Sequence, residues 1–125
     1  MESQAGKMQT QCLRIPLLAG KTPRFLDWVS LVRGREREAF EAMSGEGAVA
    51  EAIMLERGDA GDSVVYYMRA RDLERAAQVF ATSQLPIDRE TRAMIEECWD
   101  VARIQPLEVL LDLHPPKAAP DAPPQ

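Results

Sequence analysis

The sequence predicts a single α+β domain, in which helices cover one antiparallel sheet. Between Ser63 and Phe80 a run of strand formers, Val64 to Met68, gives way to apolar residues at i, i+3, i+4 and i+7, so the hydrophobic period changes from two to about 3.6. Further strand and helix patterns flank this segment on both sides. Together they predict the order strand, helix, strand, strand, helix, strand.

Length and composition fit one folded domain. The chain has 125 residues, of which 46% are hydrophobic and 28% are charged, and this is enough to bury an ordinary core. Its net charge of -5 argues against nucleic acid, because phosphate binding requires a positive field. A cationic or neutral ligand fits this charge better.

The sequence lacks the signals of export, membrane insertion and metal binding. Residues 1–10 have no apolar signal core, and no apolar run is long enough to cross a bilayer, so we expect a cytoplasmic protein without a membrane partner. Cys12 and Cys98 are too few for a disulfide framework or a zinc site and should stay as thiols. No motif for a cofactor occurs, and we expect none.

The first strand is predicted from Gln9 to Leu17, where apolar residues alternate with Cys12 and Arg14. Residues 1–8 before it carry no periodicity and are expected to be disordered.

A long helix should follow and end near Met43. Thr22 is its predicted N-cap, with Pro23 at the first helical position, and Gly34 weakens its middle. Its predicted buried stripe consists of Phe25, Val29, Val32 and Phe40.

The middle of the chain predicts a hairpin and a second helix. The strand Val49 to Glu56 is joined to the strand that begins at Ser63 by the turn-forming residues 57–62. Asp72 should cap the next helix, which extends to Thr82.

An extra helix and the last strand complete the domain, which we place at residues 9–113. The helix is predicted from Asp88, its N-cap, to Ala102, and the strand from Ile104 to Leu113. The Pro/Ala-rich residues 114–125 cannot build a core and are expected to be disordered. The extra helix should bury Met94, Ile95, Cys98 and Trp99.

This order is the split βαβ arrangement of ferredoxin-like folds, with an extra helix before the last strand. Right-handed crossovers would place the first and third strands at the centre of a four-stranded antiparallel sheet, with all helices on one face. The strands are nevertheless apolar on both faces, as in Val64 and Tyr66 against Val65 and Tyr67. Because exposed apolar patches of that size are unusual in monomers, we expect a second copy to cover the other face and form a homodimer.

The sequence resembles the dimeric α+β barrel superfamily, which includes cofactor-independent quinol monooxygenases and rhamnose mutarotases. Within it, YYMRARDLERA (Tyr66 to Ala76) and LPIDRETRAMIEECW (Leu85 to Trp99) resemble a small bacterial family of unknown function. The resemblance covers most of residues 11–113 and implies the fold and a homodimer. A His precedes the Pro-Ile-Asp element in that family, whereas this chain has Leu85, which argues against a base in this loop.

Paired sheets would enclose a cavity with Arg and Tyr side chains that could orient an anionic or oxygenated ligand. The sequence leaves open which of the two adjacent tyrosines faces it. In the structural alternative, Arg14 pairs with Glu108 across strands and the tyrosines fill the dimer interface. The candidate cavity residues are Arg14, Tyr66, Tyr67, Arg69, Glu108 and Asp112.

For the other polar residues, a structural role is as good an explanation as a functional one. The sole histidine, His114, could be a haem ligand or a general base, but its place near the tail favours a solvated residue. Asp88 and Arg89 could close over the cavity or simply cap a helix. The acidic residues Glu96, Glu97 and Asp100 are typical of a solvated helix face.

Two functional hypotheses follow. The first is a binding or accessory protein whose pocket is lined by Arg14 and Tyr67. The alternative is a cofactor-independent enzyme, of the monooxygenase or isomerase type, that uses Tyr67 and Asp112. RNA-recognition motifs share the topology, but they need a glycine-containing aromatic strand and basic surroundings, which this chain lacks.

Overall fold

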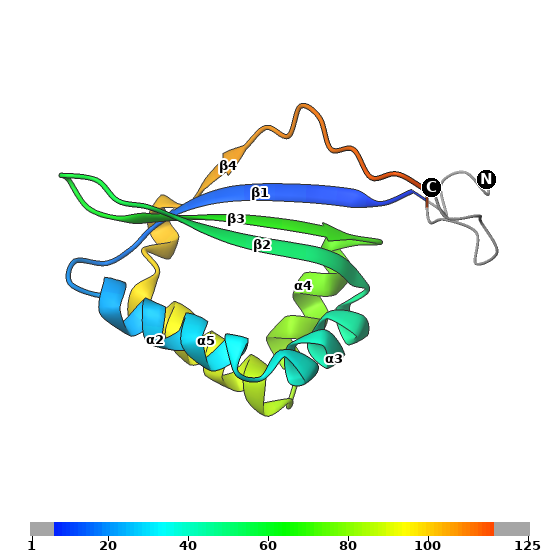
Figure 1. The fold of residues 1–125 in the computed structure, drawn as a ribbon, viewed down its shortest axis with the longest axis horizontal. Helices are drawn as coiled ribbons and strands as arrows, with labels where there is room; N and C mark the ends of the chain where they lie inside the picture. The colour runs from blue at the N-terminus through cyan, green and yellow to red at the C-terminus, as the bar shows by residue number, and fades with distance from the viewer. Residues whose placement is uncertain (1–6, 117–125) are drawn as a thin grey trace, which may run out of the picture.

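The computed structural model describes residues 7–116 and has two layers, a twisted sheet and a layer of helices on one side of it (Figure 1). The predicted disordered ends, residues 1–8 and 114–125, lie mostly outside the described residues. Within the described range no helix is long and apolar enough to cross a membrane.

Four antiparallel strands form the sheet: β1 (Gln9–Pro16), β2 (Ala48–Glu56), β3 (Ser63–Ala70) and β4 (Gln105–Leu107). Their order is β2-β3-β1-β4, so the first and third strands are central, as predicted. This topology confirms the ferredoxin-like fold class.

The helices are α2 (Thr22–Arg33), α3 (Glu36–Glu46), α4 (Leu73–Thr82) and α5 (Pro86–Cys98), followed by the short 3-10 helix η1 (Val101–Arg103). All four α-helices lie on the same side of the sheet, and α5 is the extra helix before the last strand (Figure 1). The single covered face agrees with the prediction.

The core lies between these two layers. Ile15 and Val64 on the central strands are fully buried, and they pack in one cluster with Phe25 of α2 and with Met94 and Cys98 of α5. A second cluster brings β2 and β3 together with α4 and contains Ala48, Met68, Ala70 and Ala76.

The register of β1 and β3 assigns each side chain to a face of the sheet. Ile15 is opposite Val64 and Leu13 is opposite Tyr66, so these residues all face the helices. Because side chains alternate along a strand, Tyr67, opposite Cys12, faces the other way. We call the surface opposite the helices the open face.

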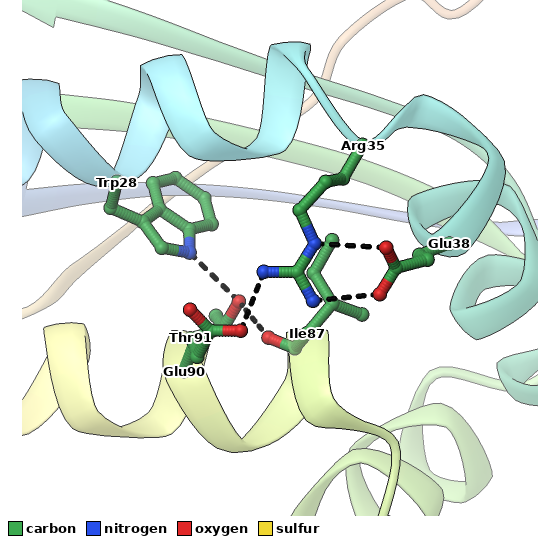
Figure 2. A network of polar contacts seen from close by, with 6 residues as sticks. All are labelled: Trp28, Arg35, Glu38, Ile87, Glu90 and Thr91. Carbon is green, nitrogen blue, oxygen red and sulfur yellow. Dashed lines mark hydrogen bonds and ion pairs between the residues drawn. The ribbon is translucent and has the colours of Figure 1, made fainter.

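The predicted long helix is two helices, separated at Gly34 and Arg35. Gly34, a poor helix former, follows the last residue of α2. Arg35 has φ −134° and ψ 46°, which is outside the helical region. Its side chain donates to Glu38 (2.7 and 2.9 Å) and to Glu90 of α5 (2.6 Å), which holds the new direction (Figure 2).

Two predictions about this region are wrong. Phe40 was expected in the buried stripe but is 60% exposed, because α3 starts in a new direction and no longer continues the stripe of α2. Thr22 was expected as the N-cap but is the first helical residue, after Lys21. Its hydroxyl donates instead to Asp62, at 2.7 Å, and ties the helix start to the hairpin turn.

Of the two other predicted caps, one is confirmed and one is wrong. The Asp72 carboxylate accepts the backbone N–H of Arg75 at 3.1 Å at the start of α4. Helix α5, however, starts two residues before Asp88, since Pro86 takes the first helical position. Asp88 is therefore inside the first turn, and it is buried.

The last strand is much shorter than the predicted Ile104 to Leu113. Only Gln105–Leu107 pairs with β1, opposite Cys12, Leu13 and Arg14. The chain then leaves the sheet edge and runs along the side away from the helices (Figure 1). Polar contacts of Asp112 with β3 account for this path, because they draw residues 108–114 away from the edge and across the open face.

The two tryptophans permit a test of the contacts between α2 and α5. Trp28 Nε1 donates to Thr91 Oγ1 at 2.8 Å, whereas Trp99 Nε1 is buried with no partner among residues 7–116 (Figure 2 shows Trp28). We predict that Trp28→Phe lowers the free energy of unfolding by about 1 kcal/mol more than Trp99→Phe, since only Trp28→Phe loses a hydrogen bond. Urea denaturation of both variants measures this difference, and equal losses would contradict the assigned contact.

Candidate functional site

The open face carries a polar cluster that joins β3 to the segment after β4. The Tyr67 hydroxyl donates to Asp112 Oδ1 at 2.6 Å, and Arg69 Nη1 donates to Asp112 Oδ2 at 3.2 Å. His114 Nε2 lies 3.3 Å from the Tyr67 hydroxyl and 3.2 Å from Asp112 Oδ1. We call Tyr67, Arg69, Asp112 and His114 the open-face cluster.

Electrostatics keep Tyr67 and Asp112 of this cluster in their ordinary charge states. The hydrogen bond from Tyr67 and the nearby His114 and Arg69 hold the pKa of Asp112 below its usual value. Burial, followed by the contact with the Asp112 carboxylate, raises the pKa of Tyr67. The tyrosine therefore stays protonated and the aspartate stays ionised, which suits a structural contact better than proton transfer near neutral pH.

The structure brings together three of the six candidate cavity residues and separates the others. Arg14 is on the open face but pairs with Glu56 of β2, at 3.1 Å. Glu108 is exposed and does not pair with Arg14, so the predicted cross-strand pair is wrong. The reason is that the chain leaves β1 after Leu107.

Tyr66 belongs to a different site, on the helix side of the sheet. Its hydroxyl donates to Glu51 Oε2 of β2 at 2.7 Å. Two helical carboxylates approach this pair, Glu46 from the last residue of α3 and Asp88 from the first turn of α5, and the Glu46 carboxyl feels the charges of both Glu51 and Asp88. We call Glu46, Glu51, Tyr66 and Asp88 the inner acidic cluster.

The members of the inner acidic cluster repel one another when ionised. Burial, together with the charges of Glu51 and Asp88, raises the pKa of Glu46 to about 8. The pKa of Glu51 is also raised, because its carboxyl lies among protein atoms although the residue as a whole keeps contact with solvent. Burial and the neighbouring Glu51 raise the pKa of Tyr66.

Sequence reasoning missed Glu46 and Glu51. Glu51 did have a signal, since it alternates with Ile53 and Leu55 and so occupies a helix-facing position of β2. Glu46 had none, because its burial depends on the direction of α3 after the break at Gly34. Asp88 was identified only as a helix cap or as part of a lid over the cavity between the sheets.

The remaining polar candidates have structural partners or are solvated. Arg24 pairs with Glu97 at 3.0 Å, and Arg103 pairs with Asp100 at 3.4 Å. Among the residues that the structure describes, no group of three or more His, Cys, Asp or Glu side chains could hold a metal ion.

Two surface hollows, of about 350 and 340 Å³, lie away from both clusters. Phe40 and Val49 line the first, and Trp28 and Glu90 line the second. Neither hollow is lined by a residue of the open-face cluster or of the inner acidic cluster. The candidate site is therefore defined by contacts between side chains and not by a hollow.

Residues 8–118 match a family described as "Family of unknown function (DUF6176)", and the chain belongs to that family. This confirms the predicted relation to a family of unknown function, and the topology confirms the ferredoxin-like fold of the predicted superfamily.

Among solved structures, the chain is similar to a crystal structure of a candidate antibiotic biosynthesis monooxygenase from Bacillus cereus. The two share 16% sequence identity with a TM-score of 0.40, and the match covers 91% of this chain and 100% of that chain. No curated protein sequence matches the chain.

The raised pKa of Glu46 predicts a dependence of stability on pH. Between its ordinary value of 4.5 and about 8, the carboxyl is ionised in the unfolded chain but protonated in the folded one, so stability falls as pH rises through this range. Glu51 acts in the same direction. We expect a loss of up to about 1.4 kcal/mol per pH unit from one such group.

Urea denaturation at a series of pH values tests this prediction. Glu46→Gln should flatten the curve between pH 5 and about 8, whereas Glu41→Gln, an exposed position of the same helix, should leave it unchanged. Asp62 and Asp112 do not interfere, since a lowered pKa affects stability only below the ordinary aspartate range. An unchanged curve in Glu46→Gln would refute the assignment.

Proposed function

We propose that the protein is a cytoplasmic homodimeric binding protein, in which two copies pair through their open faces and enclose a small molecule between the sheets. The observation that carries the proposal is the exposed apolar surface on the side of the sheet away from the helices. Met54 on this face is 46% exposed, and Val65 and Leu107 also lie there.

The segment after β4 adds to this surface. Leu110, Leu111 and Leu113 are 83%, 75% and 78% exposed, although a chain with an ordinary core seldom leaves three such neighbours in water. The open-face cluster holds the segment on this side through Asp112.

A second copy is the occupant that best fits this surface. A two-fold axis would place the exposed leucines of each copy against the open face of the other, which is the self-complementary contact that isologous dimers need. The apolar character of the patch favours a like apolar surface as its partner.

The ligand part of the proposal rests on Arg14 and Tyr67. Both lie on the open face of adjacent central strands, beside apolar neighbours such as Val65. A guanidinium and a phenol in such a setting can orient an oxygenated ligand once the second sheet excludes water.

The dimer is tested by light scattering after size exclusion, over a dilution series. We expect a mass near twice the 14.0 kDa of one chain, and Met54→Glu should convert it to a monomer because two carboxylates would be buried at the interface. Phe40→Glu, at an exposed apolar position on the helix side, is the matched control and should remain a dimer. A monomeric wild type would reject the proposal.

Ligand binding is tested separately, by a thermal-shift screen of metabolites on the wild type. A compound that binds between the sheets should raise the melting temperature of the wild type but not that of the Met54→Glu monomer, because the second sheet completes the site. If no compound stabilises the dimer, the protein serves as a structural or accessory dimer instead.

A cofactor-independent enzyme of the monooxygenase or isomerase type is the second candidate function. It is favoured by the setting of Glu46, a buried residue whose burial and neighbouring Glu51 and Asp88 charges raise the pKa of its carboxyl to about 8, in the range useful for acid–base catalysis. Turnover of a quinol or sugar should then depend on this group, so Glu46→Gln should abolish it. Turnover that survives in Glu46→Gln, Tyr67→Phe and Asp112→Asn would exclude these residues as catalysts.

A further inference from the structure

The first of the two surface hollows lies where α3 ends and β2 begins, beside the residue that follows β3 (Figure 1). Its volume is about 350 Å³, at the small end of the volumes found for ligand pockets. Residues from three separate stretches of the chain line it, namely the last turns of α3, the start of β2 and Arg71. The hollow is therefore a product of the tertiary fold and not of a single loop.

Apolar side chains that the fold leaves in water form its walls. Phe40 and Met43 are three residues apart on α3, so they share one side of this helix, and Val49 comes from β2. Phe40 is 60% exposed and Val49 is 51% exposed. A single exposed apolar residue is ordinary, but two of this size that line the same hollow form a surface that an apolar ligand would remove from water.

A β-bulge places Val49 in this wall. In the pairing of β2 with β3, Ala48 is opposite Ala70 and Ala50 is opposite Arg69, so the register skips Val49. An extra residue in one strand changes the direction of its side chain, and bulges are frequent beside functional sites. The bulge accounts for an apolar side chain at the rim of the hollow.

Among the described residues, Arg71 is the only charged one that lines the hollow. Its backbone N–H donates to the carbonyl oxygen of Gly47 at 3.1 Å, which fixes Arg71 beside the end of α3. Within residues 7–116 its exposed side chain has no hydrogen bond or ion pair, whereas Arg69, two residues earlier, is held by Asp112. A guanidinium stays charged at physiological pH and has five N–H donors, so Arg71 is available to an anion from solution.

The end of α3 opposes this positive charge only weakly. Carbonyl groups at a helix C-terminus disfavour anions, but those of Met43 and Ser44 already accept the backbone N–H of Gly47. Gly47 can make this cap because its φ of 74° lies in the left-handed region. The hollow thus combines apolar walls with one positive charge, which matches a molecule that has an apolar body and one carboxylate.

We propose that this hollow binds a small monocarboxylic acid with an apolar body, whose carboxylate pairs with Arg71 and whose body covers Phe40 and Val49. The site lies within one protomer. None of its lining residues belongs to the open-face cluster or to the inner acidic cluster, so it depends neither on the proposed dimer nor on a ligand between the sheets.

Titration with hexanoate, followed by amide NMR spectra of the isotope-labelled protein, tests the proposal. We expect the amide signals of Met43, Val49 and Arg71 to shift along a saturable curve, with a dissociation constant on the order of 1 mM. Acetate lacks the apolar body, n-hexanol lacks the charge, and hexylamine has the opposite charge. Each of these three probes should bind about threefold more weakly or not at all.

Variants at exposed positions locate the site without disturbing the core. Arg71→Gln should weaken hexanoate binding by about threefold or more, and Phe40→Glu should abolish it, because a carboxylate would then face the ligand. Arg33→Gln is the matched control, since Arg33 is an exposed arginine of α2 that does not line the hollow, and it should bind like the wild type.

Met54→Glu separates this proposal from the proposed dimer, because it should bind hexanoate even as a monomer. Loss of binding in Met54→Glu would overturn the assignment to the hollow and place the ligand between the sheets. The proposal also fails if hexanoate causes no saturable shift at these residues, if n-hexanol binds as tightly, or if Arg71→Gln binds as well as the wild type.

Discussion

The pairing register of β1 and β3 is the constraint on which the rest of this structure depends. Ile15 opposite Val64 sets one face of the two central strands against the helices, and Cys12 opposite Tyr67 necessarily sets the other face away from them. A slip of one residue would expose the core and bury Arg14. The register therefore places the adjacent residues Tyr66 and Tyr67 on opposite sides of the sheet. Tyr66 belongs to the inner acidic cluster and Tyr67 to the open-face cluster.

The two clusters differ in the partners that they give to their carboxylates. On the open face, Asp112 has both oxygens engaged, by Tyr67 and Arg69, and this contact holds the C-terminal segment in place. On the helix side, Glu46 and Asp88 are more deeply buried but have no such partner in the described chain. Satisfied polar groups strengthen a fold, so the first cluster stabilises the structure, whereas the raised pKa of Glu46 in the second makes stability depend on pH.

The sequence predicted the fold well because the fold depends on local periodicity. The strand alternation around Val64, the helical spacing after Asp72 and the extra helix near Met94 all survive in the structure. The errors arose where tertiary contacts decide. The long helix breaks because Arg35 is held by Glu90, which is distant in sequence, and the last strand ends early because Asp112 is drawn to β3. The site was predicted only on the open face, since Glu46 has no local pattern that marks it as buried.

The break between α2 and α3 links these errors to the inner acidic cluster. A single helix continued from α2 would carry Glu46 onward along the direction of α2. The turn at Arg35 instead redirects α3, and Gly47, with φ 74° in the left-handed region, then returns the chain directly into β2. Glu46 is thereby held between a helix end and a strand start, where the residue is only 7% exposed. Burial there raises the pKa of its carboxyl, so the direction that α3 takes after the break determines how the stability of the fold depends on pH.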